Sequence, residues 1–129
     1  MAKETTEKNG YNIHEEAEDG EIRIADEVVA IIAGIAAMEV QGVASLGGSW
    51  TRELIARLGR KDLSKGVRVE ITEDGVLADL TVHVKYGFSI PDVSRQVQDK
   101  VTSAIENMTG LSVLEVNIRI AGVQLDNQR

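Results

Sequence analysis

Residues 67–85 read VRVEITEDGVLADLTVHVK, and this stretch decides the fold. Its two halves alternate apolar and polar residues on either side of Asp74-Gly75, a dipeptide typical of tight hairpin turns. Alternation places the apolar side chains of a strand on one face and the polar side chains on the other. The stretch therefore predicts a β-hairpin with one buried face and one face open to water.

Two helices are predicted on either side of this hairpin. After Asp26, which we expect to cap the first helix, apolar residues as far as Met38 cover more than one helical face. This helix should be buried on two sides, against the sheet and against another helix or a subunit, with Gly42 as its stop. The second helix should begin at Ser89-Ile90-Pro91, with Ser89 as its cap, and end at Gly110.

Two further strands complete the expected fold. Gly20–Ile24 and Leu114–Ala121 alternate in the same way as the hairpin. The predicted order is strand, helix, basic segment, strand, strand, helix, strand. The economical arrangement is an α+β fold, with a four-stranded, mainly antiparallel sheet and two principal helices on one face. We expect a disordered acidic tail over 1–19, a single domain over 20–123 and a polar tail over 124–129.

Composition limits the classes of function. The chain has 129 residues, enough for one domain, and a formal net charge of −7, which argues against a broad nucleic-acid-binding surface. It has no Cys, so thiolate metal sites and thiol nucleophiles are excluded. The longest apolar run, Val28–Met38, is too short to span a bilayer, and the N-terminus has no signal-peptide pattern.

A basic, glycine-bracketed segment interrupts this acidic chain. Residues 47–66 read GGSWTRELIARLGRKDLSKG and hold five of the fourteen Lys and Arg residues and the only Trp. A Trp between glycines is costly to hydrate unless it packs on something, and basic residues on a rim steer association. The segment is therefore predicted to be an exposed interaction surface, with these partner-binding candidates: Trp50, Arg57, Gly59, Arg60, Lys61 and Lys65.

Catalytic and metal sites are not predicted. His14 lies in the expected tail, and His83 lies on the polar face of a strand, where an open sheet offers no cleft for acid–base chemistry. Glu73-Asp74 is explained by the turn, and Gly47-Gly48 is only a weak phosphate-binding signal. The chain lacks the common nucleophile, phosphate-loop and zinc-protease motifs. We expect a protein that is not an enzyme and needs no cofactor or metal.

The ordered set of short motifs resembles the bacterial alkaline-shock, or envelope stress response, family. The resemblance covers roughly residues 20–123. It is carried by GEIRIADEV at 20–28, EVQGV at 39–43, LGRK at 58–61, KGV at 65–67, YG at 86–87, IP at 90–91, NMTGL at 107–111 and VNIRIAGV at 116–123.

The resemblance implies a cytoplasmic, non-enzymatic protein that self-associates. Some members of the family are tethered beneath the membrane by a separate anchor protein and are linked to envelope stress. The branch with the Gly59-Arg60-Lys61 segment is associated with genes of fatty-acid synthesis, notably acetyl-CoA carboxylase. The family supplies no catalytic residues to carry over.

Two hypotheses follow. The first is a homo-oligomeric protein-interaction module that docks a partner through Trp50–Lys65, in envelope stress or in the regulation of lipid synthesis. The expected partners are a membrane anchor protein or the acetyl-CoA carboxylase machinery. The alternative is a small RNA-binding module that uses the basic segment 52–65, since small α+β domains with an open sheet often bind single strands. The absence of an aromatic platform on the predicted strands argues against this alternative.

Overall fold

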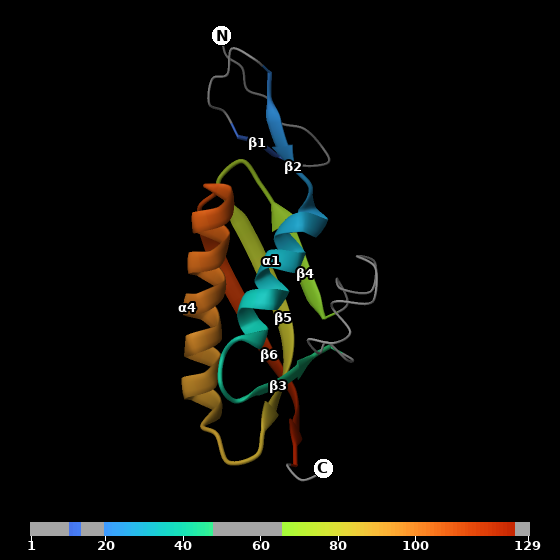
Figure 1. Cartoon of the computed structure of the whole chain (residues 1–129), viewed down its shortest axis with the longest axis vertical. Helices are drawn as coiled ribbons and strands as arrows, with labels where there is room; N and C mark the ends of the chain where they lie inside the picture. The colour runs from blue at the N-terminus through green and yellow to red at the C-terminus, as the bar shows by residue number, and fades with distance from the viewer. Residues whose placement is uncertain (1–10, 14–19, 48–65, 126–129) are drawn as a thin grey trace.

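The computed structural model describes residues 11–13, 20–47 and 66–125 (Figure 1). Side chains are described in all of these ranges except the first. The elements, in chain order, are β1 (Tyr11–Ile13), β2 (Ile22–Ile24), α1 (Asp26–Met38), β3 (Val43–Leu46), β4 (Val67–Ile71), β5 (Val76–Lys85), α4 (Ile90–Thr109) and β6 (Val113–Gln124).

The main sheet is built around β5, the second strand of the predicted hairpin. β4 pairs with it antiparallel, from Val67 opposite Leu80 to Ile71 opposite Val76. β3 pairs antiparallel with the other half of β5, and β6 pairs with it in parallel. The predicted α+β fold, with two helices over one face of a four-stranded and mainly antiparallel sheet, is confirmed (Figure 1).

Helix α4 begins and ends where the sequence predicts. The Ser89 hydroxyl oxygen accepts a hydrogen bond from the Asp92 backbone N–H at 3.3 Å, and Pro91 lies in the first turn. At the other end, Gly110 has a φ of 79° and donates its N–H to the carbonyl of Glu106 at 2.9 Å. The helix connects β5 to β6, and such a crossover allows the two strands to run in parallel.

Helix α1 differs from its prediction at both ends. Asp26 is its first helical residue rather than its cap, and the cap position belongs to Ala25, which has no side-chain hydrogen bond. Asp26 still lies in the first turn, where a negative charge interacts favourably with the helix dipole. The helix ends at Met38, and Gly42 lies in the following turn with a φ of 99°.

The first predicted strand is present but does not join the main sheet. β2 pairs with β1 in a separate two-stranded sheet, which lies beyond the end of α1 (Figure 1). The fourth strand of the main sheet is β3, whose four residues are too few for a clear alternation. β1 lies within the segment 1–19 that composition predicts to be disordered, while residues 1–10 and 14–19 lie outside the described residues.

The core lies between the helices and the sheet and is aliphatic. Every second residue of β5 is buried in it, facing the helices: Val76, Ala78, Leu80, Val82 and Val84. Helix α4 contributes a stripe of four residues at helical spacing: Val93, Val97, Val101 and Ile105. Burial of these side chains, at ~1.5–3 kcal/mol each, is the main favourable contribution to folding.

Candidate interaction surfaces

The predicted site residues lie outside the described part of the chain. Trp50, Arg57, Gly59, Arg60, Lys61 and Lys65 all fall within residues 48–65. The flanking residues Gly47 and Gly66 are described, and they fix where this segment leaves the sheet and returns. Both lie on the same edge of β5, between β3 and β4. The prediction that the basic side chains are exposed is therefore not tested.

The two flanking glycines meet at one residue of β5. Gly47 donates its N–H to the Thr81 carbonyl at 2.9 Å, and Thr81 donates its own N–H to the Gly66 carbonyl at 2.9 Å. A Cβ added to Gly66 would lie 2.6 Å from the Cα of Gly47, so the two backbones are in direct contact. The sequence shows that glycines lie at both ends of the basic segment, but no feature of the sequence indicates that these two residues contact each other.

The outer face of α1 carries large apolar side chains. Val28 is 44% exposed and Ile35 is 40% exposed, and Ile31 and Ile32 between them are partly buried. These four residues share one side of the helix because their spacing of three, four and seven residues follows the helical period. The side facing the core is built mainly of small residues: Val29, Ala30, Ala33, Gly34, Ala36 and Ala37.

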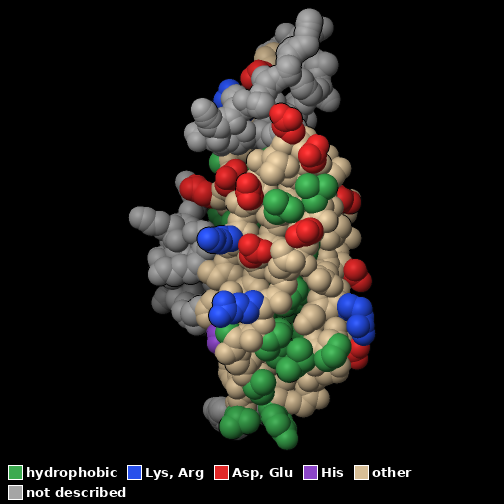
Figure 2. Space-filling view, turned by 180° about the vertical axis from the view of Figure 1, so that it is seen from behind, with side chains coloured by type: hydrophobic (Ala, Val, Ile, Leu, Met, Phe, Trp, Pro, Cys, Tyr) green, Lys and Arg blue, Asp and Glu red, His purple; other side chains and the backbone are tan. Residues whose placement is uncertain are grey.

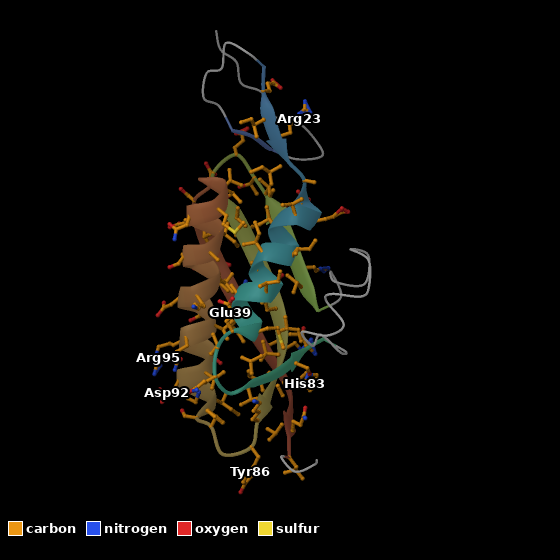
Figure 3. All side chains as sticks on the ribbon, viewed as in Figure 1. Arg23, Glu39, His83, Tyr86, Asp92 and Arg95 are labelled. Carbon is orange, nitrogen blue, oxygen red and sulfur yellow. The ribbon has the colours of Figure 1, made fainter. Side chains whose placement is uncertain are left out.

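Charged residues border this apolar face at both ends of α1. At the N-terminal end, desolvation raises the pKa of Asp26 above 3.8, and repulsion from Glu27 and from Glu70 of β4 raises it further. At the other end, Glu39, which Figure 3 labels, forms an ion pair with Lys100 of α4 at 3.6 Å between Oε1 and Nζ. The apolar stripe between these ends contains no charged side chain.

The face of the sheet turned away from the helices is polar. Asn117 of β6 donates hydrogen bonds to Asp79 of β5 at 2.9 Å and to Glu115 at 3.3 Å. Figure 2 shows acidic and basic side chains over this side of the molecule, with some apolar side chains among the acidic ones and more of them toward the end near the C-terminus. That end includes three exposed residues: Tyr86, Val123 and Leu125. Among the described strand residues of β3–β6 there is no aromatic platform for stacking bases.

His83 lies on this face, and its ring packs against the backbone of the neighbouring strand. A Cβ added to Gly122 would lie 3.0 Å from its Cδ2, which shows how closely the ring approaches β6. Its Nδ1 atom is buried and has no hydrogen-bond partner among the described residues (Figure 3 shows the residue). Within the described ranges, no group of three or more His, Asp and Glu side chains could hold a metal ion.

The chain belongs to the alkaline shock protein 23 family, described as having a cell envelope-related function, which matches residues 14–125. It is similar to the uncharacterized protein YqhY of Bacillus subtilis, with 42% identity over 115 residues that cover 89% of this chain and 85% of that protein. YloU of the same organism is 33% identical over 110 residues, covering 84% of this chain and 92% of that protein.

More distant relatives include proteins named for stress. A stress response regulator gls24 homolog of Streptococcus pyogenes is 27% identical over 110 residues, which cover 84% of this chain and 62% of that protein. Among solved structures, the copper form of the MamM C-terminal domain covers 80% of this chain and 91% of that domain, with a TM-score of 0.48 and 13% identity. A likeness at that level carries no functional information. None of the helices in the described ranges is long and apolar enough to cross a membrane.

Proposed function

We propose that this chain is a non-enzymatic interaction module of the cell envelope stress response or of the regulation of lipid synthesis. It self-associates through the outer face of α1 and docks a protein partner through the basic segment 50–65. The observation that carries self-association is the exposure of Val28 and Ile35 on a helix whose small residues face the core.

The energetic argument starts from the usual distribution of side chains in a helix. A helix on the surface of a monomer normally turns its large apolar residues inward and its polar residues outward. In α1 the alanines are buried, whereas Val28 and Ile35 are left partly in water. Covering apolar surface contributes about 25 cal/mol per Å², so a second copy of the chain seated on this face would be stabilised by it.

Partner docking is assigned to the basic segment because of its charge and its position on the sheet edge. The chain is acidic overall, whereas this segment is basic, so it would steer an acidic protein surface toward one side of the molecule. Connecting segments at a rigid edge commonly carry recognition residues. Membership of a family with a cell envelope-related function supports the biological setting.

Size-exclusion chromatography with light scattering tests self-association. The chain at tens of micromolar should elute as an oligomer, and Ile35→Glu should shift it toward the monomer because a charge would be buried in the interface. Ser103→Glu, on the exposed side of α4, is the matched control and should leave the mass unchanged. A strictly monomeric parent chain would refute this part of the proposal.

The docking role has its own test. Charge reversal of Arg57, Arg60, Lys61 and Lys65 should leave the melting temperature within a few degrees, since surface substitutions usually change stability by within ~0.5 kcal/mol. Association with the partner, measured by pull-down from the native host, should be lost. A large drop in melting temperature would show instead that the segment is part of the fold.

A further inference from the structure

We infer that residues 48–65 are an insertion into a single residue position of one continuous edge strand, so that β3 and β4 are two halves of the same strand. This inference stands on the backbone geometry of Gly47, Gly66 and Thr81. It rests on the proposed function in one respect: it takes the inserted segment as the part that docks a partner and the rest of the chain as the part that folds.

The pairing register gives the first argument. Leu46 of β3 is opposite Val82, and Val67 of β4 is opposite Leu80. In a continuous antiparallel strand, one residue between Leu46 and Val67 would be opposite Thr81. The chain instead has Gly47, the insertion and Gly66 between those two residues. The register on both sides therefore leaves room for one residue only.

The hydrogen bonds show how that one position is filled. A residue opposite Thr81 in a hydrogen-bonded pair would both donate to its carbonyl and accept from its N–H. Here the N–H comes from Gly47 and the carbonyl from Gly66, each at 2.9 Å. The two glycines together supply the groups of one strand residue, so the ladder between this edge and β5 continues without a missing bond.

Steric contact explains the glycine at 66, and a positive φ favours glycine at both positions. A Cβ on Gly66 would lie 2.6 Å from the Cα and from the N of Gly47, and both residues have positive φ, 50° for Gly47 and 85° for Gly66. The two Cα atoms are no more than about 4.1 Å apart, since a carbon–carbon bond adds ~1.5 Å, and this is close to the ~3.8 Å spacing across one peptide bond. The chain thus leaves and re-enters the strand through a neck formed by Gly47 and Gly66.

This neck has a consequence for function. Because its two ends meet at one strand position, the segment interrupts no hydrogen bond between this edge and β5. We therefore expect the sheet to fold in the same way with or without it. Long insertions with closed ends are tolerated at small entropic cost. On this inference the described strands and helices carry the stability of the fold, and residues 48–65 can differ in sequence according to the partner.

Excision tests the inference. In the excised chain, residues 48–66 are removed so that Gly47 alone joins Leu46 to Val67. We expect cooperative unfolding, with a melting temperature within about 5 °C of the full chain. Loss of cooperative folding would overturn the inference, because the segment would then belong to the fold.

A glycine-to-alanine comparison tests the shared position. In the full chain, the Cβ of Gly110→Ala would have no atom of the described residues within 4 Å beyond its chain neighbours, so this variant meets only the strain of a φ of 79°. It should lower the melting temperature by about 4–8 °C. Gly66→Ala adds the clash with Gly47 and should lower the melting temperature by roughly twice as much.

In the excised chain, Gly47→Ala becomes an ordinary strand substitution and should raise the melting temperature by about 2–5 °C. A decrease there would overturn the single-position geometry.

Light scattering on the excised chain separates this inference from the proposed function. The mass should equal that of the full chain, because self-association is assigned to α1. A folded but monomeric excised chain would refute the role of α1 and leave the insertion geometry intact. An excised chain that does not fold would refute the insertion and leave the role of α1 to the Ile35→Glu experiment.

Discussion

Helices α1 and α4 lie side by side on the same face of the sheet, yet they bury different kinds of side chain (Figure 1). Helix α4 buries Val97, Val101 and Ile105 along its length and exposes polar residues such as Arg95, which pairs with Asp92 at 2.8 Å. Its exposed large apolar residues, Ile90 and Met108, lie only at its two ends. Helix α1 buries alanines and leaves Val28 and Ile35 partly exposed. The difference indicates that α4 completes the core of one chain, whereas α1 has a second apolar face that its own chain does not fully cover.

The sharpest form of this comparison removes an isoleucine from each helix. Ile105→Ala in α4 should lower the free energy of unfolding by about 2–5 kcal/mol, because the residue is fully buried and a cavity would remain. Ile35→Ala in α1 should change it by within ~0.5 kcal/mol for the monomer. Urea unfolding at low protein concentration measures both values. Equal losses of unfolding free energy in the two variants would mean that α1 is as fully packed at this position as α4.

Enlarging a small residue tests the closely packed side of α1. Ala33 is fully buried, so Ala33→Leu should destabilise the chain by about 1–3 kcal/mol through overpacking between the helix and its neighbours. Ser103→Leu on the exposed side of α4 serves as the control and should be nearly neutral. Thermal unfolding of the two variants gives the comparison. A neutral Ala33→Leu would contradict the assignment of the alanine face to the core.

The helix caps allow a smaller contrast. Ser89→Ala should cost about 1 kcal/mol, because the side-chain hydrogen bond to the Asp92 N–H is lost. Ala25→Ser should gain a similar but smaller amount, since Ala25 caps α1 in an extended conformation and makes no side-chain bond. Denaturant midpoints with an unchanged slope would establish both effects as changes in stability. A loss of stability in Ala25→Ser would show that the start of α1 differs from the described geometry.

The smallest expected effect is the pH dependence of Asp26. Its pKa is raised in the folded state, so the folded chain binds this proton more tightly than the unfolded chain. The corresponding stability is fully present below 3.8, the ordinary pKa, and is lost as pH rises through the raised value. Asp26→Asn lacks this titration and should gain stability relative to the parent chain as pH rises over that window, by a small amount because Asp26 is exposed and solvent screens its charge. An opposite slope in parallel melting curves would contradict the raised pKa.

Much of the fold is predictable because its signals are local. The Asp74-Gly75 turn fixes the register of its hairpin, and the Ser89 cap and Gly110 fix the limits of α4. The pairing of β2 was not predictable, because three alternating residues show that a strand exists but not which strand it joins. The same limit applied to β3, whose place in the sheet depends on β5.

The candidate interaction surfaces divide in the same way. The basic segment and its partner-binding candidates came from composition alone, and their role remains a prediction, since they lie outside the described residues. The two-sided apolar character of α1 was also visible in the sequence. Which residues face outward depends on the placement of the sheet and of α4, and only the structure supplied that placement.

The sequence by itself determined the α+β class, the limits of α4 and the β4–β5 hairpin, because each depends on residues close together in the chain, and it determined the family through the order of its short motifs. Only the tertiary structure decided that β6 runs parallel to β5, that α1 leaves Val28 and Ile35 partly exposed, and that Gly47 and Gly66 share one place opposite Thr81. These features join residues far apart in the sequence. Their geometry is set by packing and hydrogen bonding across the sheet, which no local pattern encodes.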